Sequence, residues 1–177
     1  MLRAVPDDLA QRLISASQIH GDFVLSSGRR SNVYFDKFRF LTDPNLLKDT
    51  AKAVAELLPD GITHLAAPEG AATLLVAALA LETGLPIAVV RKEPKTYGTM
   101  SQLEGHAPAG AEVALVEDVS TTGAQVLSAA KVLQAAGCKV ALIVLAIDRG
   151  GGVHLREAGY WVKALVEIDP GIDPAKT

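Results

Sequence analysis

The sequence predicts an α/β fold, on three observations. Apolar runs that suit buried strands alternate along the chain with segments in which apolar residues recur at helical spacing. The chain has 177 residues, of which 49% are hydrophobic, so one domain can bury a substantial core. Several apolar runs end in polar residues and then turn into a helix, and ligands of open α/β sheets bind beyond such strand ends. We therefore expect one domain over residues 1–177, with its candidate sites at strand ends.

The first half of the chain is expected to form helices around a pair of strands, followed by a strand–turn–helix unit. Asp43 is the expected N-cap of one helix, because Pro44 follows it at the first helical position. The expected elements are a helix at residues 7–16 capped by Asp7 or Asp8, a strand at 23–25, a turn at 26–31, a strand at 33–35, a helix at 43–58, a strand at 62–67, a turn at 68–72, and a helix that ends near residue 82.

The second half is expected to continue with strands and helices in alternation. Residues 93–109 contain Pro and Gly and few large apolar side chains, so we expect a long loop there, which in a compact domain is usually functional or disordered. The other expected elements are strands at 85–91 and 112–118, a helix at 125–136 closed by Gly137, a strand at 139–147, a short helical turn at 153–158, a last strand at 160–168, and a frayed tail from residue 169.

Composition argues against several classes of protein. The net charge of −3 is unlike that of a protein that binds nucleic acid through a basic face. Cys138 is the single cysteine, which excludes an intrachain disulfide and favours a reducing compartment. Residues 1–10 lack the apolar region of a signal peptide, and no apolar run reaches the roughly 18 residues of a membrane span. We therefore expect a cytoplasmic protein without nucleic-acid or membrane partners.

The stretch of residues 113–124 offers the most specific chemistry. An apolar run ends in Glu117 and Asp118, a loop with hydroxyls and a glycine follows, and helical periodicity begins at Gln125. At a helix N-terminus, successive backbone N–H groups and the helix dipole form a cradle for phosphate. The residues expected to form this cradle are Ser120, Thr121, Thr122, Gly123 and Ala124.

The two adjacent carboxylates suit a cation or sugar hydroxyls, because like charges repel and a bare phosphate would not bind there. A ribose phosphate satisfies both halves of the stretch, with its phosphate on the loop and its hydroxyls on Glu117 and Asp118. A Mg²⁺ ion would link the acids to a diphosphate through water and sugar oxygens. The plain alternative is an acidic strand end followed by an ordinary Ser or Thr N-cap.

Residues 113–123 match neither the G-x-x-x-x-G-K-[ST] nor the G-x-G-x-x-G phosphate loop. They resemble the PRPP-binding signature of the type I phosphoribosyltransferases, which has hydrophobic residues, two acids, a short linker and Thr-Thr-Gly. Residues 21–36, with the pattern G-D-F-x-L-x-S-G-x-x-S-x-x-Y-F-D, resemble the N-terminal hood of the orotate phosphoribosyltransferase family. The R-K-x-x-K-x-Y-G segment at 91–98 and the pairs Glu104-Gly105 and Asp148-Arg149 match further motifs of that family.

Each of these segments also has a plain interpretation from its residues alone. The alternatives are a surface hairpin at 23–35, a tight turn at 68–72, a solvated cationic face at 91–95, and a loop-anchoring salt bridge between Asp148 and Arg149. Strand-end cations on the same side as a phosphate cradle are also candidates to stabilise the charge of a leaving diphosphate.

The resemblance implies a mainly parallel sheet flanked by helices, with a small N-terminal hood at about residues 1–40 and a core at about 41–168. It implies the reaction of orotate with PRPP to give orotidine 5′-monophosphate and diphosphate, a step of pyrimidine (UMP) biosynthesis. It implies Mg²⁺ as cofactor, held through PRPP and water without direct protein ligands. It also implies a homodimer in which Arg91, Lys95 and Tyr97 reach into the partner's active site.

The resemblance further implies a role for each matching residue. Lys95 is the main catalytic candidate, supported by Arg91, Lys92 and Tyr97. The PRPP-binding candidates are Glu69, Gly70, Glu117, Asp118, Ser120, Thr121, Thr122, Gly123 and Ala124. The orotate-binding candidates are Ser26, Tyr34, Phe35, Thr121 and Arg149.

The sequence departs from the family pattern at three positions. Ser26 stands where Lys is common, Glu69 where Gly or Lys is common, and Tyr97 where His is common. The departures at Ser26 and Glu69 leave open a phosphoribosyltransferase for another base, for which Arg149 would be dispensable. A non-catalytic PRPP-sensing regulatory protein is the alternative from another class. Such a protein would keep residues 117–123 but could lose the cations at 91–95, which are present here.

Overall fold

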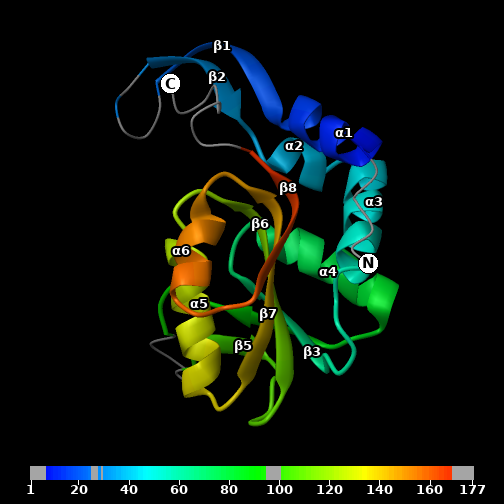
Figure 1. Ribbon diagram of the computed structural model, residues 1–177, viewed down its shortest axis with the longest axis vertical. Helices are drawn as coiled ribbons and strands as arrows, with labels where there is room; N and C mark the ends of the chain where they lie inside the picture. Colours follow the sequence, from blue (N-terminus) through cyan, green and yellow to red (C-terminus); the bar gives the residue numbers. More distant parts are fainter. Residues whose placement is uncertain (1–6, 25–27, 29, 95–100, 169–177) are drawn as a thin grey trace.

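A six-stranded sheet forms the centre of the molecule, as the computed structural model shows for residues 7–24, 28, 30–94 and 101–168 (Figure 1). The strand order is β5-β4-β3-β6-β7-β8, and every neighbouring pair is parallel except β4 and β5. The strands are β3 (His64–Pro68), β4 (Ile87–Val90), β5 (Leu103–Gly105), β6 (Glu112–Ser120), β7 (Lys139–Asp148) and β8 (Val162–Glu167). The predicted mainly parallel α/β sheet is confirmed.

Helices cover both faces of this sheet. α3 (Pro44–Ala55) and α4 (Ala72–Thr83) pack on one face, and α5 (Ala124–Ala135) and α6 (Gly151–Glu157) pack on the other (Figure 1). The sheet residues alternate accordingly. Ala114 and Val116 face the α3–α4 side, whereas Val113 and Leu115 face the α5 side, as the two-residue period of a strand requires. Burial on both faces explains why the strands read as continuous apolar runs.

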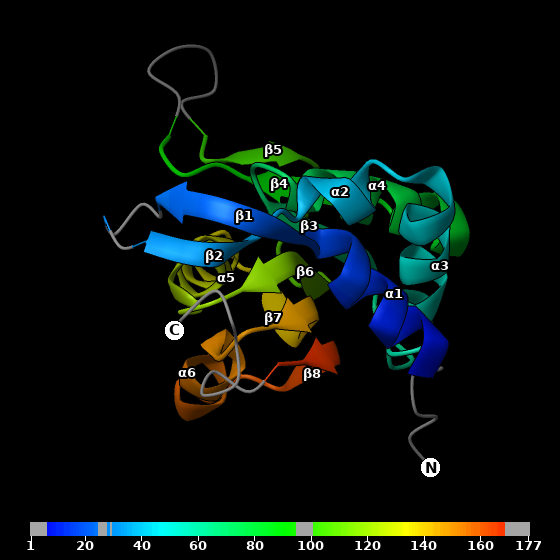
Figure 2. The same ribbon diagram turned by 90° about the horizontal axis from the view of Figure 1, so that it is seen from above.

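The N-terminal segment lies above one end of the sheet (Figure 2). α1 (Asp7–Ser17) leads directly into β1 (Gln18–Val24), which pairs antiparallel with β2 (Arg30–Phe35), and α2 (Phe38–Leu41) follows. Leu13 and Phe40, from α1 and α2, are fully buried in the same core as α3 and α4. The segment is therefore anchored by apolar burial, while the predicted boundary between hood and core near residue 40 stays a prediction.

The local signals at α3 behave as predicted. The Asp43 carboxylate accepts the backbone N–H groups of Asn45 and Leu46, each at 2.9 Å, and Pro44 occupies the first turn. Such a side-chain cap satisfies amide donors that have no partner within the helix. The helix ends at Ala55, three residues before the expected end at residue 58.

Three short or irregular elements differ from the sequence prediction. β5 lies within the segment that was expected to be a loop, α2 was not expected, and β1 begins at Gln18 rather than near Phe23. Three or four residues are too few to show a helical or strand period. In β1 the register shifts between His20 and Phe23, so the simple alternation that identifies a strand is interrupted there.

The order of the strands creates a switch point between β3 and β6. The chain leaves β3 towards β4 on one side and leaves β6 towards β7 on the other. In open α/β sheets a crevice for ligands forms outside the carboxyl ends of the strands at such a point. The loops after β3, β4, β6 and β7 therefore meet at one edge, which the hood overlies (Figures 1 and 2).

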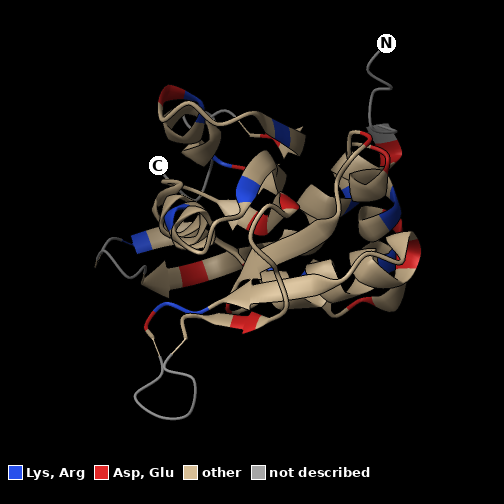
Figure 3. Cartoon of the chain, turned by 90° about the horizontal axis from the view of Figure 1, so that it is seen from below, with Lys and Arg blue, Asp and Glu red and all other residues tan. Residues whose placement is uncertain are grey.

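The surface charge is mixed. Lys and Arg are interspersed with Asp and Glu along the chain (Figure 3). Within the described ranges, no helix combines the length and the apolar character that crossing a membrane requires. The expectation that the chain binds neither nucleic acid nor membranes stays a prediction.

Candidate active site

The loop between β6 and α5, residues 120–124, is where the sequence predicts a phosphate cradle, and that role stays a prediction. β6 ends at Ser120, and α5 begins at Ala124 after Gly123, which takes a left-handed conformation with a φ of 74°. A small cavity of about 130 Å³ opens here, lined by Lys37, Glu117 and residues 119–126. Thr121 and Thr122 are exposed, and the Thr122 hydroxyl oxygen accepts the backbone N–H of Ala124, the first residue of α5, at 3.4 Å.

Ser120 is held in this loop beneath the start of α6. Its side chain is buried, and its Oγ has no hydrogen-bond partner among the residues that the structure describes. A Cβ at Gly151 would clash with this Oγ, and a Cβ at Gly123 would lie 2.8 Å from the Gly151 carbonyl oxygen. The glycines at the start of α6 therefore let that helix pack closely against the phosphate cradle.

Glu117 and Asp118 lie buried beneath the cradle. Glu117 is 4% exposed and Asp118 0% exposed. Burial is the main cause that raises the pKa of Glu117 to about 8, and the negative charge of Asp118 and a hydrogen bond to it act in the same direction. The carboxylate of Asp118 accepts the backbone N–H of Val119 at 2.6 Å. The pair thus holds a proton on Glu117 at neutral pH, beside an oriented Asp118.

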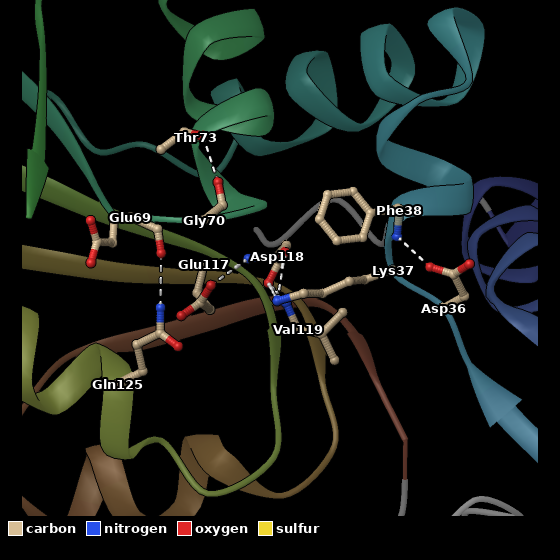
Figure 4. Close-up of polar contacts among 10 residues, drawn as sticks. All are labelled: Asp36, Lys37, Phe38, Glu69, Gly70, Thr73, Glu117, Asp118, Val119 and Gln125. Atoms are coloured by element: carbon tan, nitrogen blue, oxygen red, sulfur yellow. Dashed lines mark hydrogen bonds and ion pairs between the residues drawn. The ribbon is translucent and has the colours of Figure 1, made fainter. Parts of the chain in front are cut away.

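Lys37 is a member of this site that the sequence reasoning missed. Its Nζ lies 3.1 Å from each of the two carboxylate oxygens of Asp118 (Figure 4). Lys37 comes directly after the Tyr34-Phe35-Asp36 motif of the hood, yet it is 81 residues away from Asp118 in sequence. Only its position at the end of the hood motif could have indicated a cation near the base and ribose.

The loop after β3 contributes Glu69 and Gly70, with a φ of 123° at Gly70. The Glu69 carboxylate accepts the backbone N–H of Lys92 at 2.8 Å, and the Gln125 side chain donates to the Glu69 carbonyl oxygen at 3.2 Å. Figure 4 shows Glu69 and Gln125 joined across the site. Glu69 therefore ties the ends of β3 and β4 to the start of α5, a contact between loops that spacing in the sequence does not predict.

Arg91 and Lys92, which follow β4, lie beside these contacts of Glu69. A second cavity, of about 220 Å³, is lined by Pro68, Val90, Arg91, Lys92, Gln125, Ser128 and Ala129. Arg91 Nε donates to the Glu93 carbonyl oxygen at 3.3 Å, and an Arg91 guanidinium nitrogen lies 3.8 Å from Glu104. The structure thus brings Arg91 and Lys92 next to the loop after β3, and their predicted role at the diphosphate stays a prediction. Lys95 and Tyr97 lie outside the described residues.

Two of the expected orotate residues meet at the mouth of the site. The guanidinium carbon of Arg149 lies 4.5 Å from the centroid of the Phe35 ring, and Arg149 donates its backbone N–H to the Ser120 carbonyl oxygen at 2.8 Å. Tyr34 is 44% exposed and packs against Phe23 of β1, with ring centroids 5.6 Å apart. Ser26 lies outside the described residues.

Asp148 contacts groups other than Arg149, with which a salt bridge was the plain alternative. Its Oδ1 accepts the backbone N–H groups of Gly150 and Gly152, each at 2.9 Å, and its Oδ2 lies 3.9 Å from Arg156. Asp148 therefore shapes the turn into α6. This turn carries the Arg149 side chain towards Phe35.

The acidic residues of the site were expected to meet Mg²⁺ only through PRPP and water. The described residues include no group of three or more His, Cys, Asp or Glu side chains that could hold a metal ion. Glu69, Glu117 and Asp118 instead offer oxygens to water or sugar ligands around an ion. The expectation that Mg²⁺ binds through PRPP and water stays a prediction.

Comparison with known proteins shows the family. The family model described as "Phosphoribosyl transferase domain" matches residues 39–172. An orotate phosphoribosyltransferase of Thermococcus gammatolerans is 37% identical over 100% of this chain and 96% of its own length. That of Thermococcus kodakarensis is 47% identical over 77% of this chain and 75% of its own length.

Solved structures agree with these relatives. An orotate phosphoribosyltransferase of Mycobacterium tuberculosis superposes with a TM-score of 0.83 at 28% identity, covering 92% of this chain and 97% of that one. The same protein has been solved in complex with PRPP, with a TM-score of 0.78, 25% identity, and 92% and 96% of the two chains covered. The chain therefore belongs to the phosphoribosyltransferase family, among the orotate phosphoribosyltransferases.

Proposed function

We propose that this site transfers the 5-phosphoribosyl group of PRPP to orotate, giving orotidine 5′-monophosphate and diphosphate in pyrimidine biosynthesis. One observation supports the choice of base most directly. The buried Arg149 guanidinium lies over the Phe35 ring and is fixed through its backbone to Ser120 of the phosphate cradle. A guanidinium binds a carboxylate through two parallel hydrogen bonds, and orotate is a planar base that carries a carboxylate.

The phosphate cradle and the acid pair would bind the ribose phosphate of PRPP. The 5′-phosphate would accept hydrogen bonds from amides of residues 120–124 and from the exposed hydroxyls of Thr121 and Thr122. Glu117 and Asp118 lie beneath the cradle and accept hydrogen bonds from the ribose hydroxyls, and Thr121 faces the base. This division follows from charge, because the acids repel phosphate and the cradle attracts it.

The cations at the end of β4 would stabilise the leaving diphosphate. Arg91 and Lys92 lie beside the loop of Glu69 and Gly70 around the 220 Å³ cavity. Lys95 and Tyr97 follow in the same segment, and we assign Lys95 the main catalytic role from its match to the family motif. Positive groups placed where negative charge develops lower the barrier most effectively in a site that excludes water. Mg²⁺ bound to PRPP would neutralise further diphosphate charge.

Catalysis in this scheme is positioning without a protein nucleophile. Breaking the bond to diphosphate leaves positive charge on the ribosyl carbon. A ring nitrogen of the bound orotate attacks that carbon, and the proton on this nitrogen passes to the leaving diphosphate or to water. Holding both reactants in line converts a two-molecule encounter into a step within one complex. The hood carries Phe35 and the turn after β7 carries Arg149, and the two side chains together would hold the base.

The molecule is proposed to act as a homodimer in the cytoplasm. α4 exposes an apolar stripe at helical spacing, formed by Leu74, Ala77, Ala78 and Leu81, and Leu81 is 90% exposed. A continuous apolar face of this kind is typical of a subunit interface. The single thiol, Cys138, is buried and suits a reducing compartment.

The dimer and its shared loop can be tested together. Leu81→Glu should shift the mass measured by light scattering from dimer to monomer, whereas Val153→Glu, which alters a half-exposed apolar residue on α6, should leave the mass unchanged. At an orotate concentration low enough for Lys95→Ala and Arg149→Gln each to turn over slowly, mixing the two proteins should restore activity, because a mixed dimer contains one site with both residues intact. If the mixture stays inactive although mixed dimers form, Lys95 does not act across the interface.

The base specificity is tested by offering orotate, uracil, adenine, hypoxanthine and guanine separately with PRPP and Mg²⁺. We expect one nucleotide product, orotidine 5′-monophosphate, formed from orotate alone and identified by chromatography. Adding a chelator in excess over Mg²⁺ should stop the reaction. A nucleotide formed from one of the other bases and not from orotate would overturn the proposed function.

A further inference from the structure

Lys37 forms the polar contact between the hood and the acid pair. Its Nζ lies 3.1 Å from both carboxylate oxygens of Asp118, and it also lines the phosphate cradle. The Lys37 side chain is 38% exposed, whereas Asp118 is 0% exposed, so the lysine reaches from the open side of the site towards a buried anion. Figure 4 shows its side chain extending from the segment before α2 to the end of β6.

The backbone around Lys37 is held in place. Asp36 donates its N–H to the Ser17 carbonyl oxygen at 2.8 Å, and its carboxylate accepts the N–H of Phe38 at 3.0 Å (Figure 4). Both contacts fix the end of β2 and the start of α2. The position of Lys37 is therefore coupled to the hood.

The other charged groups near the acid pair have partners of their own. Leu145 is level with Glu117 on β7, and Ile147 is level with Val119. Beyond them, Asp148 accepts the amides of Gly150 and Gly152, and Arg149 lies over Phe35. Across β3, Glu69 accepts the N–H of Lys92. Within the described part of the chain, Lys37 is thus the cation in contact with Asp118.

We propose that Lys37 is a positioning residue of the PRPP site, which orients the Asp118 carboxylate and links the hood to the ribose site. The proposal rests on the proposed function, because it concerns how the acid pair accepts PRPP. With a proton on Glu117 and the ammonium group of Lys37 on Asp118, the three groups together carry no net charge. An anionic ribose phosphate can then enter the adjacent cradle without repulsion from two buried carboxylates.

This arrangement also links the substrate to the hood. Ribose hydroxyls that donate to Asp118 compete with Lys37 for the same oxygens, and the ammonium group lies beside the cradle where phosphate binds. Lys37 lies on the same backbone segment as Phe35 and α2. A change in its contact with Asp118 when PRPP binds would therefore reach that segment. Because Phe35 contacts Arg149, the contact between Lys37 and Asp118 also links the ribose site to the proposed base site.

The test compares Lys37→Met, which keeps the length and apolar stem but removes the charge, with Lys37→Arg, which keeps the charge. Lys139→Met is the matched control, because Lys139 pairs with Glu112 at 2.8 Å at the opposite end of β6. Steady-state kinetics over pH 6 to 9 give KM for PRPP and kcat for each protein. Calorimetry with PRPP gives the affinity independently of turnover.

We expect Lys37→Met to raise KM and Kd for PRPP by about ten-fold or more, the scale of one hydrogen bond to a charged group. Lys37→Arg should recover most of the affinity. Lys37 lowers the pKa of Glu117, so its removal should also move the inflection of the KM profile to higher pH. Lys139→Met should leave affinity and profile unchanged.

The outcomes separate this inference from the proposed function. If the unmodified protein binds PRPP and Lys37→Met binds it equally well with an unchanged pH profile, the inference is overturned and the proposed function stands. If Lys37→Arg is as impaired as Lys37→Met, charge is not what Lys37 supplies, and the inference is again overturned. If the unmodified protein does not bind PRPP, both fail together.

Discussion

Gly151 at the start of α6 lies against the side chain of Ser120, so closely that a Cβ at Gly151 would clash with the Ser120 Oγ. The same Cβ would lie 2.7 Å from the backbone nitrogen of Gly123. Two loops that follow neighbouring strands thus pack backbone to backbone at the proposed phosphate site. The shape of the cradle depends on a residue that is not itself part of it.

Gly151→Ala should therefore damage both stability and PRPP binding. Overpacking costs about 1–3 kcal/mol in the free energy of unfolding, and relief requires the backbone of the cradle to move. Gly159→Ala is the control, since Gly159 has a φ of 90° but no atom within 4 Å of an added Cβ. It should lose only about 1 kcal/mol from backbone strain and keep its KM for PRPP. Urea unfolding and steady-state kinetics measure both quantities, and equal effects of the two substitutions would contradict the packing argument.

Arg149→Gln should raise KM for orotate by about thirty-fold or more, because removing one member of a desolvated charge pair costs at least about 2 kcal/mol. KM for PRPP should change much less, since the backbone of residue 149 still bonds to Ser120. Arg156→Gln is the matched control on α6, where Arg156 forms a surface pair with Glu167 at 2.8 Å. Arg156 also lies 3.9 Å from Asp148, whose carboxylate the N–H groups of Gly150 and Gly152 hold independently. Surface pairs of this kind contribute little, so its kinetics should equal those of the unmodified protein. Equal KM values for orotate in the two variants would exclude Arg149 from the base site.

Glu117 makes the stability of the protein depend on pH. Its pKa is about 8 in the folded protein against the usual 4.5, so between these values the native state binds a proton that the unfolded chain has released. The free energy of unfolding should therefore fall as pH rises through this range. Glu117→Gln cannot titrate and should remove that part of the fall. Urea unfolding of both proteins at intervals from pH 5 to 8 measures the slopes, and parallel slopes would count against a buried, protonated Glu117.

Two roles are open for Glu69, and one pair of variants separates them. If its carboxylate acts by accepting the Lys92 N–H, Glu69→Gln should keep the contact and nearly normal kinetics, whereas Glu69→Ala should raise KM for PRPP about three- to ten-fold. If the negative charge holds water ligands of Mg²⁺, both variants should require more Mg²⁺ for half-maximal rate. We predict the first pattern, measured as rate against Mg²⁺ and PRPP concentration.

The elements that the sequence predicted well are those with long or local signals. β6 and β7 contain continuous apolar runs that are followed by acids. The Asp43-Pro44 pair is a local signal that marks the start of α3. β5 and α2 were not predicted, because three or four residues are too few to show the period of a strand or a helix. β1 escaped because the irregularity between His20 and Phe23 breaks its alternation.

The candidate site follows the same division. Residues 117–124 could be assigned because acids, hydroxyls and glycine are contiguous, and their positions next to the helix follow from the strand–loop–helix order. Contacts between distant segments could not be read in this way. Lys37 reaches Asp118 across 81 residues, and Glu69 binds the backbone of Lys92 across 23. These contacts depend on the order of the strands and on the placement of the hood. Neither can be predicted from local patterns in a single sequence.

The most direct measurement is the ultraviolet absorbance of orotate in a mixture of the protein, orotate, PRPP and Mg²⁺, with each component also left out in turn. Orotate should disappear only from the complete mixture, and the rate should fall steeply with Arg149→Gln at limiting orotate but not with Arg156→Gln. Persistence of orotate in the complete mixture, with PRPP binding shown by calorimetry, would contradict the assignment of orotate as the substrate of this site.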